Sequence, residues 1–307
     1  MPGTPGVTEA LRRLAPAAAT AEDAYLSVFR DIAALLLDRA TLYVAGQPHR
    51  LTELELYWNG LLHRDPFTHG DPMQQQLGAW YFHRSGGRYR GGTYKGLDIA
   101  FGSSEAFGGI LLRGLERVDR APDPAPPAPD PAPPAPAASL IDGPCMVVDH
   151  ILQLTASPSI EALVSRFDGM IERRDLASPL ASLLYIDLDA GPGRGAPIYA
   201  TPRIGLTLKK GSTEARRRYL ARPYRFLSEP ARIRKGKPYL VTALHLEGRS
   251  PDEIAALTGT RRAVVDGYLA AFAAGRARGA HGIEDPGGDL STEGLCRLLG
   301  ACAAAGA

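Results

Sequence analysis

Two carboxyl groups and a phenol stand at alternate positions in the segment LTELELYW, residues 51–58. In a strand, Glu53, Glu55 and Tyr57 share one face, and the apolar residues between and after them share the other. A carboxylate beside an aromatic ring can position a water molecule as a general base. A strand with one exposed face gives the same pattern, and these eight residues taken alone favour that simpler interpretation.

The segment YFHRSGGRYRGGTYKGLD, residues 81–98, mixes aromatic rings, basic side chains and two Gly-Gly pairs. Arginines pair with phosphates and aromatic rings stack on bases, whereas glycine pairs allow another surface to approach the backbone closely. This mixture is typical of a nucleic-acid contact. A hairpin with a solvated tip is the alternative.

Single titratable residues give less specific signals than these two segments. His69 and His83 could be ring donors near a substrate or ordinary hydrogen-bonding residues. Lys209 and Lys210 fit phosphate contacts better than Schiff-base amines. The sequence has no phosphate-binding loop, dinucleotide fingerprint, serine-nucleophile elbow or metal-ligand spacing. We therefore expect no cofactor and no obligatory metal.

Composition narrows the class of protein. The chain has 307 residues, of which 45% are hydrophobic and 22% charged, as in ordinary folded domains. No apolar run approaches the ~20 residues that a membrane span needs, and no secretory signal precedes the first helix. The three cysteines form no CxxC pair, which argues against a disulfide framework. We expect a cytoplasmic, nucleoid-associated protein without a membrane partner.

Charge is distributed unevenly along a chain whose net charge is only +2. Residues 209–237 contain eleven Lys or Arg and two Glu, so this segment carries +9 and the remainder −7. A local basic surface suits a polyanionic ligand. The alternative is a helix face that is merely solvated.

The pattern of apolar residues predicts an α+β fold. Residues 1–20 are expected to form a flexible arm, and residues 21–40 an amphipathic helix. Residues 41–58 read as a hairpin, and further strands before residue 120 suggest a curved antiparallel sheet with surrounding helices. Residues 121–136, with nine prolines, form an insertion or spacer. Helices are expected over 139–173 and a strand over 197–208.

The C-terminal region, residues 237–307, is expected to be helical. Ser250, Pro251 and Glu253 form a capping box at one helix start, and Gly259 ends that helix. The next helix begins near TRR, residues 260–262, which gives an arrangement that resembles a helix-turn-helix. This element either docks on DNA or packs on the main body.

Several segments, taken in order over residues 35–230, resemble the alkyladenine (3-methyladenine) DNA glycosylase family. The matching segments are RLTELELYWNG, DPFTHGDP, WYFHRSG, TYKGLDI, ILLRGLE, IDGPCMVV, PRIGL and RPYRF. The resemblance implies one glycosylase-like domain over residues 21–236, with the proline tract as an insertion. Members of the family extrude a damaged purine from duplex DNA and hydrolyse its N-glycosidic bond without a metal.

The resemblance also implies roles for individual residues. Glu55 would be the general base that activates water, and Arg113 would hold that carboxylate or its water. Tyr57 and His69 would contact the extruded base, and His83 would face it from the other side.

The base pocket departs from the family pattern at three places. His83 stands where the family has a stacking tyrosine, and Asp98 stands where it has an asparagine, which places a negative charge there. Where the family has the tyrosine that fills the gap in the duplex, this sequence has Arg88, Tyr89, Arg90 or glycine. Residues expected to contact nucleic acid are Arg84, Arg88, Tyr89, Arg90, Tyr94, Lys95, Lys209, Lys210, Arg261 and Arg262.

Together these features predict a DNA glycosylase that removes an alkylated or otherwise modified purine from duplex DNA. Two alternatives stay open. One is a non-catalytic nucleic-acid-binding protein on the same scaffold, and the other is an N-glycosidase that acts on RNA or on free nucleosides.

Overall fold

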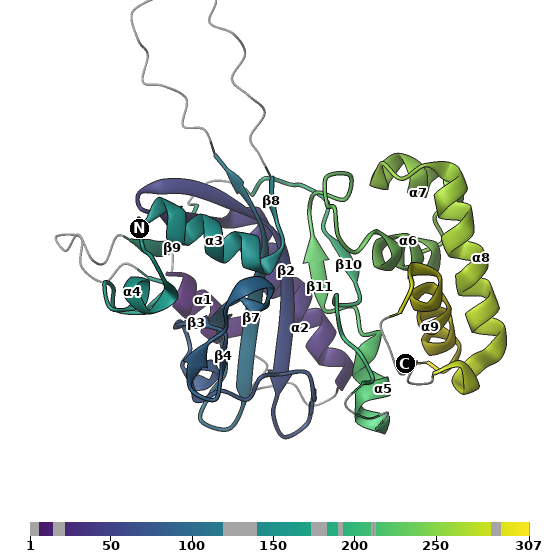
Figure 1. Ribbon diagram of the computed structural model, residues 1–307, viewed down its shortest axis with the longest axis horizontal. Coiled ribbons are helices and arrows are strands. Elements are labelled where there is room, and N and C mark those ends of the chain that lie inside the picture. The colour runs from purple at the N-terminus through teal and green to yellow at the C-terminus, as the bar shows by residue number, and fades with distance from the viewer. Residues whose placement is uncertain are drawn as a thin grey trace, which may run out of the picture.

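The computed structural model describes residues 6–14, 22–118, 140–172, 183–189, 193–209, 211, 213–283 and 290–306. These residues form helices together with a large, open antiparallel sheet (Figure 1). The predicted combination of helices and an antiparallel sheet is confirmed. The proline-rich segment 121–136 lies outside the described residues.

In the described part of the chain, the large sheet has nine strands. They are β1 (Ala40–Val44), β2 (Gln47–Asn59), β3 (Trp80–Phe82), β6 (Leu97–Ala100), β7 (Phe107–Arg117), β8 (Leu140–Asp142), β9 (Leu184–Leu188), β10 (Tyr199–Thr201) and β11 (Arg225–Leu227). A separate hairpin joins β4 (Arg84–Ser85) to β5 (Arg88–Tyr89).

The long strand β2 lies at the centre of this sheet, whose order is β10-β11-β2-β7-β6-β3. β1 pairs with β2 and β9, and β8 pairs with β7. Glu55 stands opposite Leu111 of β7 on one side and Arg225 of β11 on the other. The register of β2 against β7 shifts on both sides of Glu53. Such a bulge bends a strand and re-aims its side chains.

Helices cover the sheet and form a group beyond its β10–β11 edge (Figure 1). They are α1 (Val7–Leu14), α2 (Glu22–Ala34), α3 (Pro144–Leu154), α4 (Ile160–Val164), α5 (Glu214–Leu220), α6 (Lys237–Leu246), α7 (Pro251–Thr258), α8 (Arg262–Arg278) and α9 (Thr292–Ala304). Shorter turns are the π-helical η2 (Leu35–Arg39) and the 3-10 turns η3 (Pro72–Gln75), η4 (Gly92–Tyr94) and η6 (Gly279–Gly282).

Of the N-terminal helices, the apolar pattern of the sequence predicted α2 but not α1. The predicted helix over 21–40 is present as α2 and η2, with Phe29 and Ile32 completely buried in the main core. The flexible arm expected over residues 1–20 is wrong for residues 7–14, which form α1. Val7 and Leu11 are buried in the same core, so packing against residues far along the chain orders this short helix.

The C-terminal helices follow the predicted order. Ser250 and Glu253 form the predicted capping box of α7, and Gly259 ends α7 in the left-handed conformation with φ 63°. α8 begins after Arg261, which caps it without a side-chain hydrogen bond. A second core of buried apolar residues joins α6, α7 and α8 to Leu227 of β11.

Two predicted elements differ from those in the structure, one in its length and one in the type of its first residues. The strand expected over 197–208 extends only over Tyr199–Thr201, where it is followed by Pro202, a residue that cannot donate a ladder hydrogen bond. The helical stretch expected over 139–173 begins with the strand β8. The backbone after Thr201 instead forms a turn at residues 204–205, where the Ile204 N–H donates to Glu55 of β2.

Candidate functional site

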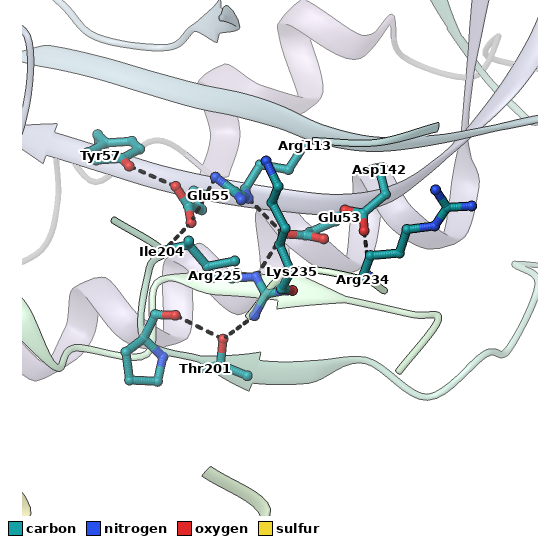
Figure 2. A network of polar contacts seen from close by, with 11 residues as sticks. Glu53, Glu55, Tyr57, Arg113, Asp142, Thr201, Ile204, Arg225, Arg234 and Lys235 are labelled. Carbon is teal, nitrogen blue, oxygen red and sulfur yellow. Dashed lines mark hydrogen bonds and ion pairs between the residues drawn. The ribbon is translucent and has the colours of Figure 1, made fainter. Parts of the chain in front are cut away.

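The carboxylate face of β2 is buried, not exposed. Glu53 is 2% exposed and Glu55 is 0% exposed. One face of the strand packs into the apolar core, and the other is covered by the segment after β10 and by side chains from β7 and β11 (Figure 2). The hypothesis that this face is a simple solvated strand is therefore excluded.

Glu55 is held by donors from three separate elements. Its Oε1 accepts the backbone N–H of Ile204 at 2.7 Å and lies 3.4 Å from Arg113 NH1. Its Oε2 accepts the hydroxyl of Tyr57 at 2.8 Å. Burial and then the neighbouring Glu55 raise the pKa of Tyr57 well above its ordinary value, so that the phenol stays protonated and donates.

Glu53 forms a buried ion cluster beside Glu55. Its Oε1 accepts from Nε of Arg113 and from Nε of Arg225, each at 2.7 Å. Burial acts to raise the pKa of Glu53, but the charges of Arg225 and Arg113 outweigh it and leave the pKa below its ordinary value. Arg113 therefore bridges the two carboxyl groups, and its predicted contact with Glu55 is present (Figure 2).

A cavity of about 370 Å³ brings together the residues predicted to form a base pocket. Its lining includes Tyr57, Phe67, His69, Gln74, His83, Arg90, Thr93, Tyr94, Lys95, Asp98, Pro144, Ile204, Gly205 and Leu206. This volume lies in the range of small-molecule sites. Since Tyr57 and Ile204 both line the cavity and both donate to Glu55, the carboxyl group lies directly behind its wall.

His83 and Asp98 form a tight pair in this cavity. His83 Nε2 lies 2.7 Å from Asp98 Oδ1, and Gln74 donates to Asp98 Oδ2 at 3.3 Å. Two glycines make room for the pair. A Cβ on Gly109 would lie 2.5 Å from Asp98 Oδ2, and one on Gly96 would lie 2.4 Å from the His83 ring.

His69 is a neutral ring at the mouth of the cavity. Its centroid lies 4.2 Å from that of His83, and its Nδ1 lies 3.2 Å from the hydroxyl of Tyr81. Desolvation and then His83 lower the pKa of His69 to about 4. Tyr81 also accepts the N–H of Arg84 at 3.5 Å, and its hydroxyl can donate to His69 Nδ1. The tautomer that fits carries its proton on Nε2.

The residues predicted to bind nucleic acid fall into two groups. One group lies at or near the cavity, and the other lies on α8 or just before α5. Arg90, Tyr94 and Lys95 line the cavity, and Tyr94 is 74% exposed. Arg88 is exposed at the β4–β5 hairpin, whereas Tyr89 packs on the main core.

Several of the predicted cations are already engaged by carboxylates of the chain. Arg84 pairs with Asp71 at 2.5 Å, and Lys95 pairs with Asp149 of α3. Arg262 pairs with Asp252 and, at 2.9 Å, with Asp266. Among these pairs, Arg262–Asp266 joins residues four apart on α8, whereas the others join residues that only the fold brings together.

The remaining predicted contacts lie on the helical side of the molecule. Arg261 is exposed at the start of α8, and Lys209 is exposed before α5. Lys210 lies outside the described residues. The structure therefore does not bring Arg261, Arg262 and Lys209 into the cavity.

Sequence reasoning missed three residues that shape the site. Gln74 donates to Asp98, and Arg225 completes the cluster around Glu53. Arg203 is 0% exposed, pairs with Asp65 at 2.5 Å and lies 4.4 Å above the Tyr57 ring. Arg203 and Arg225 lie in PRIGL and RPYRF, so an arginine inside an apolar segment was the available signal.

Comparisons with known proteins add little about activity. No protein-family model matches the chain. The chain is 28% identical over 226 residues to an uncharacterized protein, L759, of Acanthamoeba polyphaga mimivirus. The matched region covers 69% of this chain and 91% of the viral protein. The described residues include no helix long and apolar enough to cross a membrane, and no cluster of three or more metal-binding side chains.

Proposed function

We propose that the protein hydrolyses the N-glycosidic bond of a modified purine that has been extruded from duplex DNA. The observation that carries this proposal is the position of Glu55, a buried carboxyl group directly behind a cavity lined by Tyr57, His69, His83 and Asp98. An alkylated purine is a good leaving group, so the enzyme needs mainly a placed water molecule and a pocket for the base.

Glu55 has the surroundings that a water-activating base needs. Each carboxylate oxygen accepts two hydrogen bonds, so Oε2 can accept the Tyr57 hydroxyl and a water molecule together. Ile204 and Arg113 fix the other oxygen from two directions, which holds the carboxyl group in one orientation. In this proposal, Glu55 takes a proton from a water molecule while the oxygen of that water attacks the sugar carbon. The electrons of the broken C–N bond leave with the purine.

The cavity walls supply contacts for a purine ring. Tyr57 and the paired His83 offer ring surfaces, and stacking on such rings stabilises a base by about 1–3 kcal/mol. Asp98 offers acceptor oxygens, whereas neutral His69 offers Nε2–H as a donor. These groups complement the mixed donors and acceptors at the edge of a purine.

The first prediction concerns Glu55→Gln, which should lower base release from methylated duplex DNA by at least about 100-fold. The amide keeps the shape of the side chain and can still accept from Ile204, but it cannot take a proton from water. Release is measured by chromatography of the freed bases, and DNA affinity should stay within about twofold of the wild type.

Glu105→Gln is the matched control, because Glu105 is exposed outside the cavity and should tolerate the same change. Equal release by Glu55→Gln and wild type would remove Glu55 as the base. Release from RNA or free nucleosides in place of DNA would change the substrate, and no release from any of them would contradict the proposed hydrolysis.

A further inference from the structure

A buried amide lines the cavity beside Asp98. Gln74 belongs to the turn η3 and is 1% exposed, and Asp98 is 2% exposed. Burying an amide or a carboxylate costs free energy unless hydrogen bonds compensate for the lost water. The partners of Gln74 therefore indicate what its amide can do.

Two neighbours fix the orientation of this amide. Its Oε1 accepts the N–H of Gly70 at 3.0 Å, and its Nε2 donates to Asp98 Oδ2 at 3.3 Å. The reverse orientation would place an amide oxygen against a carboxylate, so the network assigns the two ends. An amide nitrogen carries two N–H groups, and Asp98 takes one of them. The second N–H is left for a molecule in the cavity.

The backbone holds the Gln74–Asp98 pair in place. The Gln74 N–H donates to Asp71 O at 2.8 Å, and Gln74 O accepts the N–H of Gly102 at 3.1 Å. Gly109 of β7 lies directly against the pair, because a Cβ there would lie 2.5 Å from Asp98 Oδ2 and 2.6 Å from Gln74 Nε2. The pair therefore has little freedom to move when a ligand enters.

Asp98 presents acceptors beside the amide donor. A carboxylate offers about four acceptor sites, and His83 Nε2, at 2.7 Å, and Gln74 occupy one each. A donor next to an acceptor is the pattern that a purine edge complements, for example with O6 beside N1–H in hypoxanthine.

We propose that Gln74 and Asp98 together read a base edge on which an N–H lies next to an acceptor. The proposal rests on the proposed function, because it assumes that a purine enters the cavity. It narrows the substrate class to purines whose modification leaves such an edge intact, as in 7-methylguanine. In 1,N6-ethenoadenine a second ring removes every N–H, so this base presents no donor to Asp98 in any orientation. Gln74 is thus a specificity-determining residue and takes no part in bond cleavage.

The first test compares duplexes that contain a single hypoxanthine or a single ethenoadenine, two uncharged bases. Wild-type protein should release hypoxanthine at least about 100-fold faster, because a site built to bond an N–H rejects an analogue that lacks it. Gln74→Met keeps the length of the side chain without its amide, and it should lower hypoxanthine release by about tenfold or more. Gln76→Met is the matched control, since Gln76 is exposed, and it should keep the wild-type preference.

A second measurement removes the difference in reactivity between the two bases. Glu55→Gln protein, titrated with each duplex and followed by fluorescence anisotropy, should bind the hypoxanthine duplex about tenfold or more tightly than the ethenoadenine duplex. Adding Gln74→Met to this protein should remove most of that preference. The comparison within Glu55→Gln protein needs no change at Gln74, so it stands even if Gln74→Met does not fold.

The outcomes separate the two proposals. A binding preference that depends on Gln74, without base release from any DNA, would refute the hydrolysis and support the reading of the edge. Release of methylated purines with equal release and equal binding of hypoxanthine and ethenoadenine would refute the reading of the edge alone. If Gln74→Met weakens both bases to the same extent, Gln74 only supports the fold and the proposal is wrong.

Discussion

Two glutamates that are two residues apart on β2 share Arg113 but otherwise have different partners. Glu53 accepts from two guanidinium groups, those of Arg113 and Arg225, and belongs to a charged cluster in the protein interior. Glu55 accepts from two uncharged donors, Tyr57 and Ile204, and lies beside the cavity. The first arrangement neutralises charge, whereas the second fixes the orientation of a carboxyl group behind the cavity wall.

Glu53→Gln should lower the free energy of unfolding by about 3–5 kcal/mol, because it leaves the buried Arg225 without a carboxylate partner and Arg113 with Glu55 alone. Chemical denaturation measures this loss. Glu105→Gln, at an exposed position, should change stability by less than about 0.5 kcal/mol. A Glu53→Gln protein as stable as the wild type would show that the cluster does not hold β2, β7 and β11 together.

At the scale of residues, alternation along a strand correctly placed Glu53, Glu55 and Tyr57 near one another. Their burial could not be predicted, because the covering groups come from far along the chain. Ile204 is 149 residues from Glu55, and Arg225 is 172 residues from Glu53. His69, His83 and Asp98 were identified individually, but the pair and the cavity depend on the folded sheet.

At the scale of elements, local signals were reliable where they satisfy local hydrogen bonds. The capping box of α7 closes within four residues and was predicted correctly. The helix α1 has no such signal, and long-range contacts fix it, among them the Thr8 N–H donated to Glu172 at 2.7 Å. The strand β10 ends earlier than predicted, and the backbone after it does not continue the sheet, because the Ile204 N–H donates to the side chain of Glu55 instead of to a neighbouring strand.

The crossing of α8 and α9 depends on two helical glycines, and this gives a prediction about stability. A Cβ on Gly300 would lie 2.0 Å from Phe272 O, and one on Gly275 would lie 1.9 Å from Arg297 O. Gly300→Ala should therefore destabilise the protein by about 2 kcal/mol or more, although alanine favours helices. Thermal or urea denaturation measures the change.

Gly267→Ala is the matched control on the exposed face of α8, where nothing lies within 4 Å of the added Cβ. It should stabilise the protein by about 0.5–1 kcal/mol through helix propensity alone. If both substitutions are stabilising, the close crossing of α8 and α9 is wrong.

At the scale of the whole molecule, the basic segment 209–237 is only partly a surface. Arg225 is buried with Glu53, Arg232 pairs with Glu116, and Lys237 donates to backbone carbonyls, including Pro230 O at 2.8 Å. Part of the charge that suggested a polyanion site is therefore engaged by groups of the chain itself. Of the residues predicted to contact nucleic acid, Arg90, Tyr94 and Lys95 line the cavity, whereas Lys209 of the basic segment does not.

Three histidines make the stability of the molecule depend on pH. Burial, with a further contribution from His150, lowers the pKa of His49 to about 4. Burial likewise lowers the pKa values of His63 and His69 to about 4. Because the ordinary value is about 6.5, the unfolded chain binds more protons than the folded chain between these limits. The free energy of unfolding should therefore be highest above about pH 6.5 and should fall as the pH decreases toward 4.

His49 and His63 are both 0% exposed, so each should contribute on the order of 2–3 kcal/mol to this loss. His63 contacts Trp58 O and the Tyr224 hydroxyl, each at 2.9 Å, and Gln can contact both without taking a proton. Urea denaturation of His63→Gln should show lower stability at neutral pH but a shallower decline between about pH 6.5 and 4.5. His281→Gln, at an exposed position, should keep the wild-type slope, and an unchanged slope in His63→Gln would show that His63 is not buried in its neutral form.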